Sequence, residues 1–451
     1  MAIAFEHPIK VDKAASALIT GVLCWAIFVL GSKAVAPHLT EAFHHFKENF
    51  VGNDLLKYFY EERLLHHLSE ISNILFFLMG AMTIVELVDA HEGFSVITDR
   101  ITTNNKVKLM WIIGILTFFF SAVLDNLTTS IVMISLLRKL VKDKESRWLF
   151  AGLVVIAANA GGAWSPIGDV TTTMLWIKGQ LPNVLNMVEY LILPSFVALL
   201  IPLVVLSFTL KGGTIERPNK AEGAEHYMNP TTSGERTVVF ILGIAGLLFV
   251  PVFKTITHLP PFMGMMLSLG VLWVVTEMLH KSKNKEEKHS LSVIGVLQKI
   301  DVSSVLFFLG ILLAVSALQE VGHLMVMAAW LDTTIGNIYG INVAIGFLSA
   351  IVDNVPLVAA AQGMYEIATP TIIEGATNGA YLQNFTANGS FWQFLAYCAG
   401  VGGSSLIIGS AAGVAVMGLE KIDFIWYLKK ISWLAVIGYL AGALVFILMH
   451  S

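Results

Sequence analysis

The chain has 451 residues, of which 56% are hydrophobic and 13% are charged, whereas a soluble domain carries about a quarter charged residues. The mean hydropathy of +0.73 excludes water as the main solvent, and the formal net charge of −4 at pH 7 provides no basic surface for nucleic acid. The two cysteines, Cys24 and Cys398, supply neither a disulfide framework nor a thiolate metal cluster. Apolar runs of helical length therefore predict an all-α polytopic membrane protein.

Residues 1–63 contain the first apolar run, 17–31, which is close to the roughly 20 residues that a membrane-spanning helix needs. Lys10 and Lys13 precede this run. Because lysine collects on the cytoplasmic side of membrane helices, they predict a cytoplasmic N-terminus. The polar residues that follow are predicted to lie outside the membrane. The histidines at 38, 44, 45, 66 and 67 are expected to be solvated surface residues, and the alternative is a pH-sensing cluster.

An internal repeat organises the rest of the chain. Three pairs of similar segments occur in the same order in its two halves: EISNILFFL (70–78) with DVSSVLFFL (301–309), SAVLDN (121–126) with SAIVDN (349–354), and the glycines at 161, 162 and 168 with those at 402, 403 and 409. We therefore predict one repeat at 64–210 and a second at 295–451, joined by loops and transmembrane helices at 211–294.

The basic residues predict that the two repeats have opposite orientations in the membrane. Lysines and arginines at 100–108 and 138–147 flank Asp125 on both sides, whereas residues 300–420 contain neither. A re-entrant hairpin at about 107–140, with Asp125 near its tip, keeps both basic flanks in the cytoplasm. The corresponding hairpin at about 340–366, which carries Asp353, should enter from the other side. This is the pattern of inverted-topology repeats.

Glycine-rich segments predict a broken helix in each repeat, at about 148–180 and 391–420. Residues 159–169 read NAGGAWSPIGD, and residues 400–409 read GVGGSSLIIG. Non-helical backbone at membrane depth is tolerated only where it lines a cavity or is buried in protein, and paired interruptions point to a transporter's substrate site. The alternative is that these glycines serve only close helix packing.

Two polar pairs, Asp125 with Asn126 and Asp353 with Asn354, interrupt apolar runs at equivalent places. An acid at the bilayer centre costs at least about 2.5 kcal/mol, so such residues usually have a function. Carboxylate and amide oxygens, with hydroxyls such as Ser121, Thr128 and Ser349 nearby, are the ligands that a hard cation such as Na⁺ or Li⁺ prefers. The alternative for each aspartate is a structural role as the N-cap of a half-helix.

A carboxylate that binds sodium when ionised and a proton when neutral makes the two ions compete for one site. Competition combined with alternating access gives antiport. Asp169 closes the first helix break, while its counterpart in the second repeat is Ser410. Asp169 is therefore either an ion ligand or a local cap.

The motifs at 121–129, 161–169, 349–356 and 402–405 resemble those of the NhaD-type sodium/proton antiporters. These belong to the ion transporter superfamily, which also contains arsenite permeases and dicarboxylate carriers. The resemblance covers most of the chain from about residue 64. It implies two re-entrant hairpins, two broken helices, a homodimer in a bacterial inner membrane, and exchange of cytoplasmic Na⁺ or Li⁺ for external protons. Such exchange serves sodium efflux and pH homeostasis, with no cofactor beyond the transported ions.

The resemblance also implies which residues handle the ions. The main set would be Asp125, Asn126, Thr128, Asp353 and Asn354, with Na⁺ bound at the two aspartates and the two asparagines. Further candidates are Ser121, Ser349, Ser404, Ser405 and Asp169.

Two other functions fit parts of the pattern. An arsenite or dicarboxylate carrier on the same scaffold would need cationic groups near the helix breaks, and none is evident there in the sequence. An intramembrane aspartyl protease would need a Gly-x-Gly-Asp motif, and the chain has PIGD at 166–169 instead. We therefore expect a cation antiporter and not an enzyme.

Overall fold

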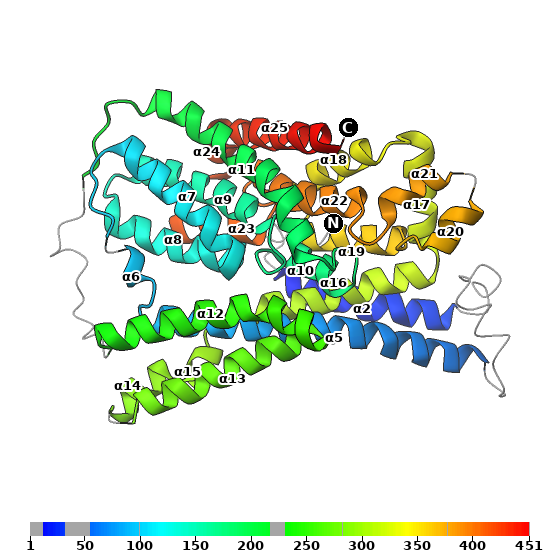
Figure 1. The fold of residues 1–451 in the computed structure, drawn as a ribbon, viewed down its shortest axis with the longest axis horizontal. Helices are drawn as coiled ribbons and strands as arrows, with labels where there is room; N and C mark the ends of the chain where they lie inside the picture. The colour runs from blue at the N-terminus through cyan, green and yellow to red at the C-terminus, as the bar shows by residue number, and fades with distance from the viewer. Residues whose placement is uncertain are drawn as a thin grey trace.

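The computed structural model describes residues 12–31, 55–98, 100–216, 231–281, 283–376 and 378–450. The regular elements of this part of the chain are helices (Figure 1). Eight of them are long and apolar enough to cross a membrane: α2 (Lys13–Leu30), α5 (Leu55–Ala90), α7 (Lys106–Leu124), α11 (Val184–Thr209), α12 (Ser233–Thr257), α13 (Pro261–Leu279), α16 (Val302–Glu320) and α25 (Ser432–His450). The predicted all-α, multi-pass membrane protein is confirmed.

The other helices include α9, which is as long as several of these spans, and a set of shorter ones. In chain order they are α6 (Ser95–Thr98), α8 (Asn126–Leu140), α9 (Lys144–Gly162), α10 (Val170–Ile177), α14 (Lys285–Leu291), α15 (Val293–Leu297), α17 (His323–Thr334), α18 (Ile338–Ser349), α19 (Asn354–Met364), α20 (Pro370–Gly375), α21 (Gly379–Leu382), α22 (Ser390–Gly402), α23 (Ala411–Glu420) and α24 (Phe424–Lys430), with 3₁₀ turns η2 (Gln383–Phe385) and η3 (Gly403–Ser405).

The predicted hairpin and broken-helix segments coincide with helices that stop and restart. Residues 107–140 hold α7 and α8, which meet at Asp125, and residues 340–366 hold α18 and α19, which are separated by 350–353. The glycine-rich segments separate α9 from α10 and α22 from α23. In Figure 1, α7, α8 and α9 lie on the left of the molecule, and both α18 and α19 lie to the right of them, with α10 near the centre. Whether either hairpin is re-entrant stays a prediction.

The same packing pairs occur in both halves of the chain. Helix α7 packs on α9, and α18 packs on α22. Helix α8 packs on α23, while α19 packs on α10, so each hairpin also touches the broken helix of the other half. A methyl group added at Gly161 would overlap the carbonyl oxygen of Phe118, and one added at Gly402 would overlap that of Gly346. These glycines allow α9 and α22 to lie directly against the backbones of α7 and α18.

The N-terminal helix α2 runs beside α16 (Figure 1). A Cβ on Gly310 would overlap the backbone of Ala17, so the two helices approach without an intervening side chain. Further along, Trp25 donates its indole N–H to the carbonyl oxygen of Leu313 at 3.0 Å. Helix α2 is therefore held in a fixed register on α16.

Helix α5 begins at Leu55, before the predicted start of the first repeat at residue 64, and continues for 36 residues to Ala90. The expectation of solvated histidines is wrong for His67, which is buried and lies 2.8 Å from the Oε1 of Glu320. Arg63 also donates to this carboxylate oxygen, at 2.6 Å. The polar start of α5 is therefore held against α16, because Arg63 and His67 both pair with Glu320. Residues 32–54, with His38, His44 and His45, lie outside the described residues.

At the opposite end of α5, two buried imidazoles join it to α13. The Nε2 atoms of His91 and His280 lie 3.0 Å apart, and the rings are stacked with centroids separated by 5.0 Å. Burial lowers the pKa of His91 to about 4. His91 is therefore uncharged at neutral pH, and the pair packs without an uncompensated charge.

Alanine at Gly161 or Gly402 should destabilise the protein by about 1–3 kcal/mol, because the added methyl group meets backbone that has no room to move. The matched control is Gly270→Ala on α13, where nothing lies within 4 Å of the new atom. We expect a lower thermal unfolding midpoint in detergent for the first two variants and no decrease for the control. An unchanged midpoint in Gly161→Ala would contradict the close approach of α7 and α9.

Candidate functional site

The tip of the first hairpin is formed by Asp125, which ends α7 and caps α8. Its Oδ1 accepts the backbone N–H groups of Leu127 and Thr128 at 2.7 and 3.2 Å, and its Oδ2 accepts the hydroxyl of Thr128 at 2.8 Å. Its backbone has φ 74° and ψ 161°, a region that is rarely populated outside glycine and costs on the order of 1–3 kcal/mol. The cap anticipated as an alternative is present, and the strained backbone holds this carboxylate at the helix break.

The tip of the second hairpin differs from the first. Asp353 occupies the N-cap position of α19, but its side chain accepts no capping hydrogen bond. Its Oδ2 lies 3.2 Å from the Nζ of Lys13 at the start of α2. From the sequence we expected no cationic group near the helix breaks. This expectation is wrong at the second hairpin tip, where Lys13 contacts Asp353 although the two residues are 340 positions apart in the sequence.

Asp169 lies where the two halves meet. It is the N-cap of α10, and its Oδ1 accepts the backbone N–H and the hydroxyl of Thr171, each at 2.8 Å. Its Oδ2 accepts the Nδ2 of Asn126 at 2.6 Å and that of Asn354 at 3.1 Å. The side chain is buried, so desolvation would be costly without these donors. One carboxylate thus binds the asparagines next to both hairpin tips.

Asn159 extends this polar network. It is fully buried near the end of α9, and its Oδ1 accepts the Nδ2 of Asn126 at 3.1 Å. Its own Nδ2 donates to the hydroxyl of Ser410 at 3.0 Å, at the break between α22 and α23. Side chains from both helix breaks and both hairpin tips therefore form one hydrogen-bonded network, which runs from Ser410 through Asn159, Asn126 and Asp169 to Asn354.

The serines of the two hairpins have a common structural role. The hydroxyl of Ser121 donates to the carbonyl oxygen of Ala158 at 2.5 Å, and that of Ser349 donates to Ala399 at 2.8 Å. Each serine thereby ties the first helix of its hairpin to the neighbouring broken helix. Both hydroxyl hydrogens are thus used between helices and not on the carboxylates.

The two serines of the second break lie apart from the carboxylates. Ser404 donates its hydroxyl to the carbonyl oxygen of Val401 at 2.7 Å, and its own carbonyl accepts the hydroxyl of Tyr427 at 2.8 Å. The hydroxyls of Ser405 and of Thr129 are buried with no hydrogen-bond partner among the described residues. Buried unpaired hydroxyls are uncommon in folded proteins.

A small cavity of about 20 Å³ adjoins the first hairpin tip. Asp125, Asp169 and Thr173 supply its polar lining, and the remaining walls are apolar side chains such as Phe77 and Leu247. Such a volume holds roughly one water-sized particle. The carboxylates of Asp125 and Asp169 therefore belong to two residues that line one cavity of about the size of a single water molecule.

The three aspartates do not form a compact metal centre. Among the described residues, no group of three or more His, Cys, Asp or Glu side chains could hold a metal ion. The arrangement instead distributes carboxylates and amides over two hairpin tips and one helix break, with Asp353 beside Lys13.

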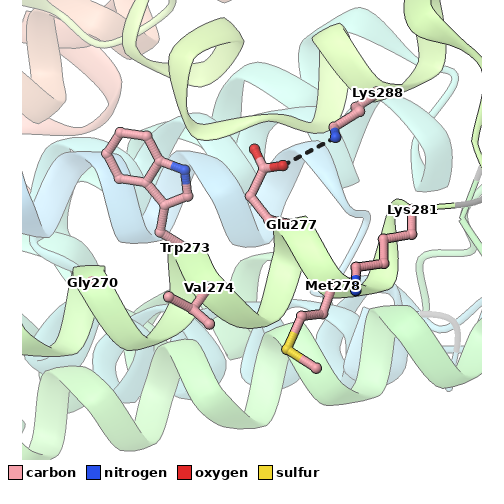
Figure 2. Close-up of a pocket in the computed structure, with 7 residues that line it drawn as sticks. All are labelled: Gly270, Trp273, Val274, Glu277, Met278, Lys281 and Lys288. Carbon is pink, nitrogen blue, oxygen red and sulfur yellow. Dashed lines mark ion pairs between the residues drawn. The ribbon is translucent and has the colours of Figure 1, made fainter.

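A larger pocket lies away from these residues. It has a volume of about 600 Å³ and is lined by α13 and the start of α14 (Figure 2). Figure 2 shows Glu277 paired with Lys288 across its edge, at 3.2 Å. Val274 and Met278 of this pocket are mostly exposed, so it is a depression on the outer face of α13. None of the residues that line this pocket belongs to the polar site at the helix breaks.

Comparison with known proteins shows the family of the chain. The citrate transporter family model, CitMHS, matches residues 1–379. The chain belongs to the citrate transporter family. It is 45% identical to sodium/proton antiporter 1 of Arabidopsis thaliana over 100% of this chain and 70% of that protein, and 47% identical to sodium/proton antiporter 2 of the same plant over 86% and 88%. It is also 31% identical to the Na⁺/H⁺ antiporter NhaD of Vibrio parahaemolyticus over 83% and 89%. The resemblance to NhaD-type antiporters is confirmed.

The structure brings together part of the set predicted from the sequence. Asp125, Asp169, Asn126 and Asn354 share direct or cavity contacts. The hydroxyls of Ser349 and Ser404 instead donate to backbone carbonyl oxygens, and the Ser405 hydroxyl has no hydrogen-bond partner among the described residues. Sequence reasoning missed Asn159. Its signal was available, because it is the one amide in the apolar run 149–163 of α9.

The shared acceptor predicts that Asn126 and Asn354 are energetically coupled. Alanine at either position should cost about 1.5–3 kcal/mol, as expected for a hydrogen bond to a charged group. The double substitution should cost less than the sum, because a carboxylate that has lost one donor can take up a proton and no longer needs the second. The measurement is the unfolding free energy in detergent.

The control pairs Asn126→Ala with Asn342→Ala. Asn342 donates to the carbonyl oxygens of Ile338 and Phe391 and shares no partner with Asn126. This second pair should be additive. Additivity of Asn126→Ala with Asn354→Ala would show that Asp169 does not couple the two tips.

Proposed function

We propose that the protein is a secondary active transporter that exchanges Na⁺, and also Li⁺, for H⁺ at the carboxylates of the helix breaks. The observation that carries this proposal is the buried carboxylate of Asp169, which accepts amide hydrogens from both Asn126 and Asn354 and faces a cavity shared with Asp125. Relatives named sodium/proton antiporters match 86–100% of the chain at 45–47% identity. The protein is a transporter and not an enzyme.

The chemistry of the site favours exchange of Na⁺ for H⁺ over transport of a cation alone. An ionised carboxylate is a ligand for a hard cation, and the same oxygen binds a proton when the cation leaves. Asp125 and Asp169 lie on one cavity that holds about one small ion. Because both amides donate Nδ2 to Asp169, the carbonyl oxygen of each is left as a further oxygen ligand for the cation. Sodium and proton therefore compete for the same atoms.

Alternating access would use the two hairpins as inverted re-entrant elements. Two pairs of equivalent contacts support this: Ser121 with Ala158 matches Ser349 with Ala399, and Gly161 packs on α7 as Gly402 packs on α18. Asp169 contacts the asparagine of both tips, so displacement of either tip changes the environment of the same carboxylate. The division into repeats at 64–210 and 295–451 belongs to this proposal, as does the homodimer implied by the family resemblance.

The orientation follows from charge. Lysines and arginines concentrate between α11 and α12 and around α14, and the positive-inside rule places these connections in the cytoplasm. The N-terminus belongs to the same side. The bacterial inner membrane expected from the sequence is not supported, because two of the most similar relatives are plant proteins.

The family description, citrate transporter, favours an anion carrier as the second candidate. An anion site needs excess positive charge, and Lys13 does lie at the second hairpin tip. Its ammonium, however, is paired with Asp353 at 3.2 Å. The neighbouring carboxylates of Asp125 and Asp169 add negative charge that would repel citrate.

The direct test is proton flux in proteoliposomes that hold an imposed pH gradient, followed with a pH-sensitive dye. Addition of Na⁺ or Li⁺ should discharge the gradient, while K⁺, citrate, arsenite and succinate should not. Discharge by citrate alone would replace the cation antiporter with an anion carrier on the same fold.

Asp125→Asn and Asp353→Asn should each reduce sodium-driven proton flux to the level of empty vesicles, because an amide keeps the shape of the side chain but takes up no proton at physiological pH and lacks the negative charge that attracts the cation. Asp143→Asn is the matched control. Asp143 also caps a helix, α9, by accepting from Ser146, and this variant should retain exchange. Retained flux in both site variants would remove these aspartates from the mechanism.

A further inference from the structure

The second hairpin tip contains a cation that belongs to the protein itself. The Nζ of Lys13 lies 3.2 Å from Oδ2 of Asp353, and the two side chains are 18% and 11% exposed. The same Nζ lies 4.6 Å from the centre of the Phe307 ring, where the aromatic face attracts a positive charge. Both contacts favour a charged ammonium at this position.

Lys13 is placed by rigid packing and not by a flexible tail. Asp12 caps α2 by accepting the backbone N–H of Ala14 at 2.7 Å. The same carboxylate accepts the hydroxyl of Ser303 at 2.8 Å, which fixes the start of α2 beside the start of α16. Five residues further on, Ala17 meets Gly310 at backbone distance. The lysine therefore extends from a fixed helix end toward the hairpin tip.

The two hairpin tips differ in how their carboxylates are held. Asp125 accepts two backbone N–H groups and one hydroxyl, all of them neutral donors. Asp353 makes no capping bond to α19, and its Oδ2 accepts from the ammonium of Lys13. A monovalent cation is thus already bound at the second tip.

We propose that Lys13 is a tethered competitor of sodium at Asp353, so that its ammonium must move away before a sodium ion can bind this carboxylate. This inference rests on the proposed exchange of Na⁺ for H⁺. Sodium and ammonium both carry one positive charge, and both bind carboxylate oxygen. The lysine therefore weakens the apparent affinity for sodium and prevents an unpaired negative charge at Asp353 when no ion is bound.

The test measures the sodium dependence of exchange in Lys13→Gln, Lys13→Met and Lys13→Arg, at about pH 9, where protons compete weakly with sodium for a carboxylate. The apparent KM for Na⁺ should decrease by about fivefold in the Gln and Met variants, a change equivalent to roughly 1 kcal/mol. It should not decrease in Lys13→Arg, which keeps the charge. A structural defect would lower kcat and would not lower KM.

The control is Lys283→Met. Lys283 is also largely buried and pairs with Glu235 at 3.0 Å, close to the end of α13, and its removal should leave KM unchanged. A second measurement, the increase of the thermal midpoint with Na⁺ in detergent, reports binding without transport. It should reach half of its maximum at a lower Na⁺ concentration in Lys13→Gln than in the wild type.

The outcomes separate this inference from the proposed function. Absence of Na⁺-driven exchange in the wild type overturns the proposed function. Exchange in the wild type, with an unchanged or increased KM in both Lys13→Gln and Lys13→Met, overturns the competitor role alone. An equal decrease of KM in Lys13→Arg also overturns it, because the charge would then not be the cause. If the neutral variants do not accumulate, a decreased KM in Lys13→Arg still decides against the proposal.

Discussion

The site depends on one buried negative charge, the carboxylate of Asp169, and on the need to satisfy it away from water. A buried carboxylate is tolerated only when most of its lone pairs accept hydrogen bonds. Thr171 supplies two of these bonds locally, and Asn126 and Asn354 supply the others from two separate hairpins. The requirement of a single side chain thus fixes the relative positions of three chain segments that are far apart in sequence.

The helix breaks follow from the same constraint on polar groups. Every half-helix that starts after a break exposes backbone N–H groups that must be satisfied. Asp125 caps α8, Asp169 caps α10 and Ser410 caps α23 through their side chains. Asp353, at the start of α19, is the exception. Its carboxylate pairs with Lys13 and makes no capping bond. Asp353 can therefore exchange Lys13 for another cation without removing a cap from α19.

The sequence predicted where the helices break, but not how the breaks meet. Asp125, Asp353 and the paired glycines stand out locally because polar and glycine residues interrupt apolar runs. The repeat itself concealed the role of Asp169, since symmetry assigns Ser410 to the equivalent position and gives no reason to favour one side. Lys13 could not be linked to Asp353, because no local pattern connects residues 340 positions apart. His67 was misjudged for the same reason, since its partner Glu320 lies on a distant helix.

The different partners of the two tip aspartates give them different electrostatic roles. A sodium ion that binds beside Asp125 adds positive charge to a carboxylate held only by neutral donors. A sodium ion that replaces Lys13 at Asp353 exchanges one monovalent cation for another, so the local charge at that tip does not change. Two sites that look equivalent in the sequence can therefore contribute unequally to the charge that crosses the membrane in one exchange.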